Sequence, residues 1–361
     1  MKKLLGLLFL GLLLSSNAYA ATIENCSVDS GEISGRDVDN KLDNIYRCES
    51  DDIFVLDEGQ YVVGVKDRID LENNSADRVV INNSGWIEST KNGSNAISGD
   101  GADTVTLNNK STGTFTGTIK SPNAIYIGAG SNWEIDNYGD IYGTAAKAIN
   151  IKDGDNNKIT NRSGAEIKAD GVNSIIIWGD SATSDNTIIE NYGTITATQT
   201  AVKIGTKSTN TTVTNYSGGI IQATTDDGTQ RAGIQIDAAN SIITNKGTIS
   251  GAGNLHSIEI KDNVTGTKIY VDGAPTFTGE VELNNTAANT TMYLGCNMSQ
   301  DTTIEIHNKP SLNITNNLCG NDTYTIQDSS QNADADNSET NGYLVIDEGL
   351  EVVSYNAKYR S

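Results

Sequence analysis

The stretch Ile243-Thr244-Asn245-Lys246-Gly247-Thr248-Ile249 decides the fold, because its pattern occurs seven times along the chain at a nearly constant interval. The pattern is an aliphatic residue, any residue, Asn, a short gap, Gly, a spacer and usually a second aliphatic residue. From Asn83 in the first copy to Asn245 in the last, six intervals span 162 residues, so the mean period is 27 residues. Such a repeat is typical of a solenoid, in which each coil contacts only its neighbours.

A second motif has the same period. It is a small residue followed by aliphatic-x-aliphatic, as in Ala148-Ile149-Asn150-Ile151 and Ala201-Val202-Lys203-Ile204. From Ile97 to Ile258 its six intervals span 161 residues, again close to 27 per repeat. The two motifs together predict three short strands per coil: one that ends in Asn, one after Gly, and the small-x-aliphatic strand. We therefore expect an all-β fold, a right-handed parallel β-helix with about 27 residues per coil and inward aliphatic stacks.

The recurrent Asn and Gly are interpreted as structural residues. Alternation along a strand places each Asn on the same side as the aliphatic residue two positions earlier, so its amide points inward at a bend. Stacked amides donate and accept along the axis, which predicts an asparagine ladder, and the Gly is expected to supply a positive φ. The predicted ladder is Asn83, Asn109, Asn137, Asn161, Asn191, Asn215 and Asn245, and the predicted turn glycines are Gly85, Gly113, Gly139, Gly164, Gly193, Gly218 and Gly247.

The N-terminus predicts export. Lys2 and Lys3 precede an apolar run from Leu4 to Leu14, and Ala18-Tyr19-Ala20 has the small-x-small pattern of a signal-peptidase site. The run is too short for a stable membrane span, and no later stretch approaches the length of one, so we expect no transmembrane segment in the mature chain. The Sec export machinery would carry the chain through the inner membrane. It would then be secreted or displayed on the bacterial cell surface, in the outer membrane if a barrel is supplied.

Charge and composition limit the classes of partner that the protein is expected to bind. The formal net charge of −21 argues against nucleic acid, whose phosphates bind Lys and Arg, and against adhesion to anionic lipid. No cofactor is predicted. Binding specificity is expected in the variable turns between strands or at outward tyrosines; the candidates are Tyr126, Tyr138, Tyr192 and Tyr216.

The four cysteines form two local pairs at opposite ends of the repeat region. Three connectivities are possible, but only local pairing avoids joining the two ends of an extended body. We expect the disulfides Cys26–Cys48 and Cys296–Cys319, each stabilising a cap. The predicted organisation is a signal peptide at 1–20, an N-terminal cap with a disulfide at 21–75, β-helix repeats at 76–285, a C-terminal cap with a disulfide at 286–325, and an acidic linker with a strand-like tail at 326–361.

No catalytic or metal site is predicted. Glycoside hydrolysis needs two carboxylates facing each other across a sugar. The acidic turn residues are instead interpreted as solvated groups that cap nearby backbone; they are Asp153, Asp155, Asp180, Asp185, Asp226 and Asp227. His256 and His307 are the only histidines, and neither lies in a metal-ligand or Gly-His-Gly pattern. Asp-Gly-Asp at 153–155 only weakly suggests calcium, because the repeated nonapeptide of calcium-binding β-rolls is absent.

With this leader and these Asn-x-Gly-x-Ile coils, the chain resembles the passenger domain of a bacterial autotransporter, a type V secretion protein. The resemblance covers residues 1–320 and rests on repeats such as Ile-Thr-Asn-Lys-Gly-Thr-Ile-Ser-Gly at 243–251. The closing residues 351–361 resemble the linker that leads into the family's outer-membrane barrel. The segment after Asn341 is too short for that barrel, so the expected protein is a passenger that lacks the C-terminal translocator.

The resemblance implies an adhesin-like scaffold at the cell surface, non-catalytic, which offers a long lateral face and its turns to a glycan or to another cell's surface. Two alternatives stay open. One is a polysaccharide-active β-helix enzyme, a lyase or a glycosidase. The other is a truncated gene product without independent function.

Overall fold

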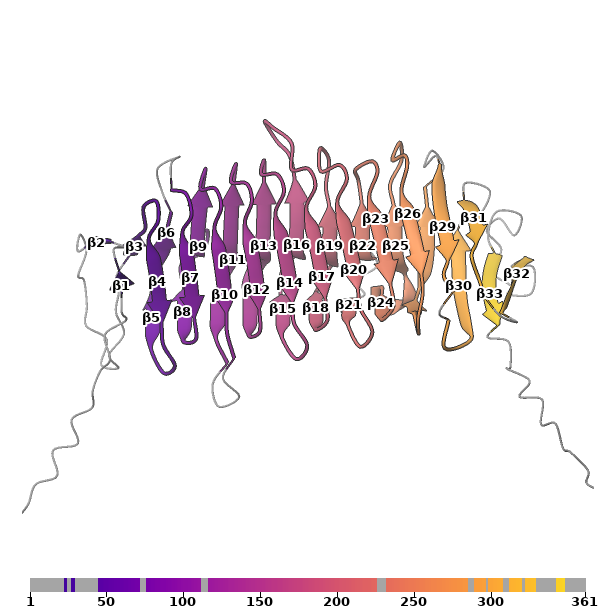
Figure 1. Cartoon of the computed structure of the whole chain (residues 1–361), viewed down its shortest axis with the longest axis horizontal. Coiled ribbons are helices and arrows are strands. Elements are labelled where there is room, and N and C mark those ends of the chain that lie inside the picture. Colours follow the sequence, from indigo (N-terminus) through magenta and orange to yellow (C-terminus); the bar gives the residue numbers. More distant parts are fainter. Residues whose placement is uncertain are drawn as a thin grey trace, which may run out of the picture.

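The chain is an elongated stack of about ten parallel coils (Figure 1). The computed structural model describes residues 23–24, 27–29, 45–71, 76–111, 116–225, 232–284, 289–296, 298–307, 312–319, 322–328 and 342–347. The predicted signal peptide, Cys26, Gly113, Asp226 and Asp227 lie outside these ranges. Within them, the single helical element is a short 3-10 turn, η1 (Ala252–Asn254).

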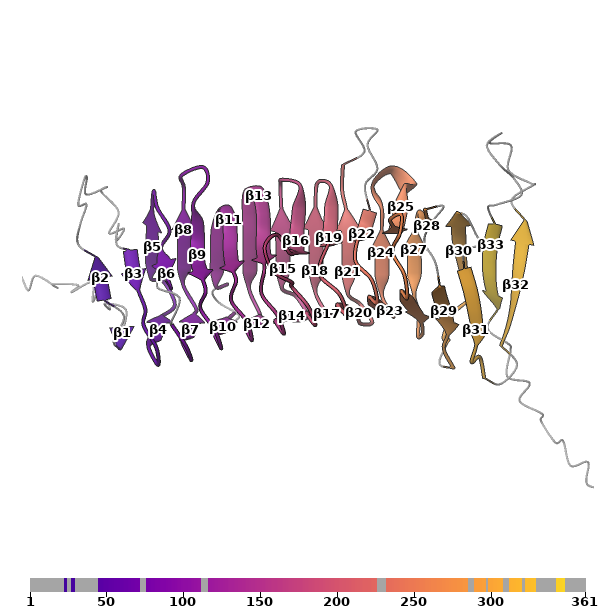
Figure 2. The same ribbon diagram turned by 90° about the horizontal axis from the view of Figure 1, so that it is seen from above.

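The strands line up on three faces that run along the stack (Figures 1 and 2). The first face contains β1 (Ile23–Glu24), β4 (Ile53–Leu56), β7 (Val80–Asn83), β10 (Thr106–Asn109), β12 (Glu134–Asn137), β14 (Lys158–Asn161), β17 (Ile188–Asn191), β20 (Thr212–Asn215), β23 (Ile242–Asn245), β26 (Lys268–Val271), β29 (Thr290–Leu294) and β31 (Leu312–Asn316). The second face contains β5 (Tyr61–Gly64), β8 (Trp86–Ser89), β11 (Thr118–Gly128), β13 (Asp140–Lys152), β15 (Glu166–Ala169), β18 (Thr194–Ala197), β21 (Ile220–Ala223), β24 (Thr248–Ser250) and β27 (Thr276–Thr278).

The third face contains β3 (Ile45–Arg47), β6 (Ile69–Asp70), β9 (Asn95–Asp100), the C-terminal halves of β11 and β13, β16 (Asn173–Trp178), β19 (Thr200–Ile204), β22 (Ala232–Ile236), β25 (His256–Ile260), β28 (Glu280–Leu283) and β30 (Thr302–His307). β11 and β13 pass from the second face to the third without interruption. The three strands predicted per coil are therefore confirmed, and each pairs in parallel with its counterparts in the neighbouring coils.

Stacks of inward aliphatic side chains fill the core. On the first face, Ile135 pairs in register with Leu107 and Ile159, and all three are fully buried. The second and third faces contribute their own fully buried stacks, such as Ile141 next to Ile167 and Ile149 next to Ile175. Burying each such side chain contributes about 2 kcal/mol, so the repetition itself supplies most of the stabilisation.

The seven recurrent asparagines lie in one register column and are all fully buried. In the first six, Nδ2 donates to Oδ1 of the Asn in the next coil at 2.8–3.0 Å. Each Nδ2 also donates to a backbone carbonyl at the start of the next coil's second-face strand, as Asn191 does to Ile220 O. Coils between successive asparagines are 26, 28, 24, 30, 24 and 30 residues long, so the turns absorb all the variation.

The glycines that follow the asparagines require a correction. Of the six that the structure describes, only Gly164 and Gly218 have a positive φ, +82° and +81°. Gly85, Gly139, Gly193 and Gly247 do not; instead a Cβ there would lie 2.1–2.4 Å from a carbonyl oxygen of the preceding coil. At these four positions glycine is needed because two backbones approach closely.

Register gives a second correction in the coils whose bend is longer. The position equivalent to Gly139 is Gly117 in the preceding coil, Ala165 in the following coil and Gly219 two coils further on, because the residues after them pair with one another. The predicted Gly164 and Gly218 belong instead to the inserted part of the bend. For the same reason the inward residue after Gly218 is Ile221, which is fully buried, and not the exposed Ile220.

Antiparallel strands close both ends of the stack. β1 pairs antiparallel with β4, and β2 (Ser27–Asp29) pairs antiparallel with β3. At the other end β33 (Gly342–Asp347) lies between β30 and β32 (Thr323–Asp328) and is antiparallel to both. Parallel pairing extends through β4–β6 and β29–β31, beyond the bounds of 76 and 285 expected for the repeats.

The predicted disulfide between Cys296 and Cys319 is confirmed, with a Cα–Cα distance of 4.7 Å. It joins the turn after β29 to the turn after β31, on the first face of the last coils. Cys48 is also disulfide-bonded, and Cys26, the partner expected for it, lies outside the described residues.

Candidate functional site

A row of large side chains follows the asparagine ladder along the first face. The residue after each ladder Asn is, in five successive coils, Tyr138, Arg162, Tyr192, Tyr216 and Lys246, which we call the axial stripe. The backbone N–H of each stripe residue donates to the carbonyl oxygen of the ladder Asn one coil earlier, at 2.7–2.9 Å. The buried ladder therefore fixes the position of each stripe residue on the surface.

The stripe side chains contact one another along the axis. The Arg162 guanidinium lies 5.4 Å from the centre of the Tyr138 ring, and the rings of Tyr192 and Tyr216 stack at 4.0 Å and 7°. Strands stacked about 4.8 Å apart bring aromatic rings into contact when they occupy the same register position. A hydrogen bond to Tyr192, partial burial and the nearby charge of Glu190 raise the pKa of Tyr216 to about 12, so its hydroxyl is neutral at ordinary pH.

Carboxylates on the adjacent strand positions hold the stripe cations. Arg162 donates two hydrogen bonds to Asp136, of 2.6 and 3.1 Å, and this pairing raises the pKa of Arg162. At the C-terminal end of the stripe, Lys246 lies 3.1 Å from Asp272. The stripe therefore presents hydroxyls and cations in fixed positions on an otherwise acidic protein.

A hollow of about 310 Å³ adjoins this end of the stripe. Its walls include Lys246, Asp272 and the stacked rings of Tyr270 and Tyr293, whose centres are 4.6 Å apart. Cys296, one half of the disulfide, also lines it. The hollow is shallow and apolar in part, and it carries hydroxyls, a cation and a carboxylate at its rim.

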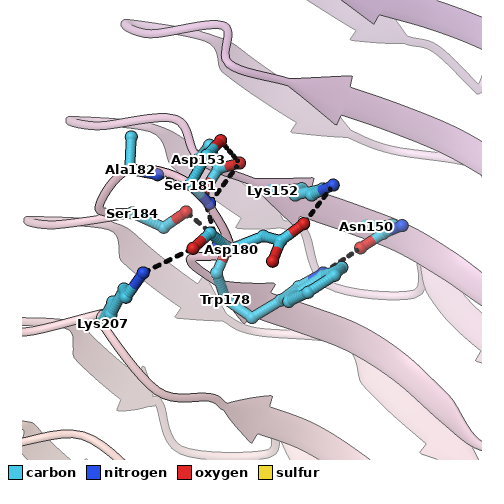
Figure 3. Close-up of polar contacts among 9 residues, drawn as sticks. All are labelled: Asn150, Lys152, Asp153, Trp178, Asp180, Ser181, Ala182, Ser184 and Lys207. Atoms are coloured by element: carbon cyan, nitrogen blue, oxygen red, sulfur yellow. Dashed lines mark hydrogen bonds and ion pairs between the residues drawn. The ribbon is translucent and has the colours of Figure 1, made fainter.

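The turn after β16 takes part in a polar network that includes residues of the neighbouring coils (Figure 3). Asp153 accepts hydrogen bonds from the backbone N–H of Asp180 at 2.5 Å and of Ala182 at 3.0 Å, and from the hydroxyl of Ser181 at 2.9 Å. Lys152 lies 3.0 Å from the Asp180 carboxylate and 5.2 Å from the centre of the Trp178 ring. This turn projects from the upper edge of the stack in Figure 1.

Three of the described turn aspartates, Asp153, Asp155 and Asp185, cap backbone in the next coil, while the Asp180 carboxylate pairs with Lys152. Asp155 accepts from the N–H of Asp185 at 2.7 Å, and Asp185 accepts from the N–H of Thr209 at 2.8 Å. Partial burial opposes ionisation of Asp153, but the four hydrogen bonds that it accepts outweigh burial and hold its pKa below the ordinary value. The carboxylates of Asp153, Asp155 and Asp185 are thus used as hydrogen-bond acceptors within the fold.

The second face carries a separate tyrosine–cation pair. Lys168 lies 5.1 Å from the centre of the Tyr142 ring and 3.4 Å from Asp170, which also contacts the Tyr142 hydroxyl. Partial burial and that contact raise the pKa of Tyr142 to about 12. The pair resembles Tyr138 with Arg162 in composition but lies on a different face, away from the ladder.

Sequence reasoning missed what the structure does with the two histidines. His256 on β25 and His307 on β30 both contact Glu280 on the strand between them. The signal in the sequence is their spacing, because residues about one coil apart come into register: His256 lies opposite Glu280, and Glu282 lies opposite His307.

Within the described ranges, no helix is long and apolar enough to cross a membrane.

No family model matches the chain, and no curated protein matches it. Among solved structures, the crystal structure of PfbA, a surface adhesin of Streptococcus pneumoniae, is similar with a TM-score of 0.42 and 10% sequence identity. That similarity covers 76% of this chain and 80% of the other.

Proposed function

We propose that the protein is a secreted or cell-surface scaffold that binds through its lateral face, in the manner of an adhesin, without catalysis. The axial stripe carries the proposal. Five successive coils present aromatic rings, a guanidinium and an ammonium over about 19 Å, in positions set by backbone hydrogen bonds to a buried ladder. Such a fixed row of hydroxyls and cations suits an extended polar polymer, and we name a glycan on another cell's surface as the partner.

The autotransporter passenger is the class that the sequence resembles, and it supports this location. The leader, the coil motif and the closing segment all fit a chain that crosses the inner membrane through the Sec machinery. Protease added to intact cells of the source organism tests the location. Degradation of the protein without lysis supports surface display, and complete protection in intact cells contradicts it.

A matched pair of variants tests the binding face. The double variant Tyr138→Ser/Arg162→Ser removes a tyrosine–cation pair from the stripe, and Tyr142→Ser/Lys168→Ser removes a similar pair from the second face. On a glycan array and on whole cells, we expect the stripe variant to lose at least about 10-fold in affinity and the control to bind as the unchanged protein does. Equal binding by both variants, or no binding by the unchanged protein, contradicts the proposal.

The polysaccharide-active alternative has its own readout. Incubation of the purified chain with acidic and neutral polysaccharides would release unsaturated or reducing-end products if the protein were a lyase or a glycosidase. We expect no such products, because the turn aspartates are used as backbone caps.

A further inference from the structure

The two histidines of the chain converge on two glutamates in the last coils. Glu280 and Glu282 are two positions apart on β28, so alternation places both on the side opposite to the buried Val281 and Leu283. Glu280 lies 3.1 Å from His256 Nδ1 and 3.1 Å from His307 Nε2, and Glu282 lies 2.8 Å from His307 Nδ1. Ligand atoms of His256, Glu280 and Glu282 all lie within 4.8 Å of one another.

A β-bulge creates this arrangement. His256 is paired with Glu280 and Ile258 with Val281, so β25 has one more residue than β28 between the two pairs, namely Ser257. The Ser257 hydroxyl donates to the Glu280 carbonyl oxygen at 3.0 Å and stabilises the irregularity. Bulges redirect side chains and are common beside functional sites. Here the bulge keeps the core pair Ile258–Val281 in register while it sets His256 against Glu280.

One atom of the cluster is buried without a hydrogen bond. His256 is 5% exposed, and its Nδ1 makes no hydrogen bond in the structure although Glu280 Oε1 lies 3.1 Å away, because the two groups are not aligned for one. A buried polar atom of this kind costs about 1–3 kcal/mol unless something else binds it. Two ligands on a tetrahedral ion with bonds of 2.0–2.1 Å are about 3.3 Å apart, which is close to this separation.

We propose that His256, Glu280 and Glu282 bind one divalent transition-metal ion, with Zn²⁺ as the expected ion. An imidazole nitrogen with two carboxylates suits zinc, whereas Ca²⁺ and Mg²⁺ favour ligand sets made of oxygen alone. Glu282 is 7% exposed, so its carboxylate is held in the low-exposure surroundings where a bound cation interacts strongly with it. His307 is a positioning residue, because its ring nitrogens contact both carboxylates and set the distance between them.

The proposed metal site is separate from the axial stripe, and binding through the stripe does not require it. It lies on the third face and ties β25 to β28, while His307 extends the connection to β30. β25 belongs to the coil of Asn245, the last member of the asparagine ladder, whose amide donates to Thr276 O in the next coil. The ion would therefore connect successive coils at the point where the ladder ends.

The experiment uses the untagged, purified chain, because a histidine tag would itself bind zinc. After removal of metal with a chelator, titration calorimetry with Zn²⁺ is expected to give one ion per chain, and thermal melting is expected to rise with Zn²⁺ but not with the same concentration of Ca²⁺. X-ray absorption of the zinc-loaded, unchanged protein is expected to show nitrogen and oxygen ligands with imidazole scattering. This spectrum needs no variant, so it stands even if a substitution prevents folding.

Variants identify the ligands. His256→Ala and Glu282→Gln are each expected to weaken Zn²⁺ binding by more than about 100-fold, and His307→Gln by roughly 10- to 100-fold. Glu134→Gln, at an exposed glutamate on β12, is the control and is expected to bind as the unchanged protein does. The proposal is overturned if the unchanged protein binds no stoichiometric Zn²⁺, if the spectrum shows oxygen ligands only, or if His256→Ala binds as tightly as the control.

Discussion

The coils from Asn83 to Asn245 and the coils after Val271 use the same core but satisfy their polar groups differently. In the first region every coil places an Asn at the same buried position, and amides connect each coil to the next. In the second region that position is occupied by Val271 and then Leu294, both fully buried. A disulfide, buried glutamates and antiparallel strands appear there instead. Where the amide column is continuous it joins each coil to the next, and the histidine–glutamate cluster lies where that column ends.

The largest effect is expected where the ladder is uninterrupted. Asn191→Leu removes an acceptor from Asn161 and a donor from Asn215, both of which stay buried. Leaving two such groups unsatisfied should lower the free energy of unfolding by about 4 kcal/mol. Denaturant unfolding measures this loss directly. An unchanged midpoint would show that the asparagine ladder does not stabilise the fold. Asn245→Leu is the matched control at the end of the ladder, and it should cost about half as much because its next neighbour is Val271.

Removal of the disulfide tests the second region. Replacing Cys296 and Cys319 together with alanine opens a connection with a sequence separation of 23 residues. The expected loss is about 3 kcal/mol, and it should be local because coils interact only with their neighbours. Hydrogen exchange should become faster in β29 and β31 and stay unchanged in β12 to β20. Faster exchange throughout the stack would show that the two regions unfold as one unit.

The two kinds of turn glycine predict two sizes of effect. In Gly139→Ala the new Cβ meets the Gly117 carbonyl oxygen at 2.1 Å, so backbone must move and the cost should be about 2 kcal/mol. In Gly164→Ala nothing lies within 4 Å of the Cβ, and only the φ of +82° opposes the substitution, at about 1 kcal/mol. Thermal melting of both variants checks the order, and a larger loss in Gly164→Ala would contradict the close-approach explanation.

The smallest expected effect is on the stability of the protein at acidic pH. The folded-state pKa of Asp153 lies below its ordinary value, so the stabilisation that this carboxylate gives is present above its unfolded pKa near 4 and is lost as the pH falls through the folded value. Asp153→Asn should lower the stability at pH 7, where the stabilisation by the carboxylate is fully present, and the difference from the unchanged protein should shrink as the pH falls below 4. Asn is a suitable replacement because residue 153 has a φ of 58°, which Asn tolerates. Identical acid unfolding in both proteins would contradict this role.

Most of the fold was predictable because it depends on period and alternation alone. Two motifs that share one spacing predict three strands per coil, the inward isoleucines and the position of each Asn. The roles of the turn glycines were predicted less well. The number of residues between the Asn and the Gly decides whether the glycine lies against the backbone of the preceding coil or adopts a positive φ. Gly139 lies two residues after its Asn and Gly164 three, and the strand register shows that Ala165, not Gly164, is equivalent to Gly139.

The histidine–glutamate cluster could not be predicted from local motifs. His256 and Glu280 meet through a bulge at Ser257, and a bulge depends on how two particular strands pair. The axial stripe was partly visible, since Tyr138, Tyr192 and Tyr216 were candidates for an outward position. Arg162 and Lys246 were missed as members of the same row, because neither is aromatic and each follows the Asn of a different coil.

The direction of the asparagine ladder bears on how the molecule can change in length. Each Asn from Asn109 to Asn215 accepts from the Asn of the coil before it and donates to the Asn of the coil after it, so the two ends of such a coil are complementary. Duplication of one coil would add a rung with both partners already supplied, and deletion of one would join two surfaces that already fit. The rod can thus grow or shrink by whole coils during evolution, and with it the reach of whatever it displays.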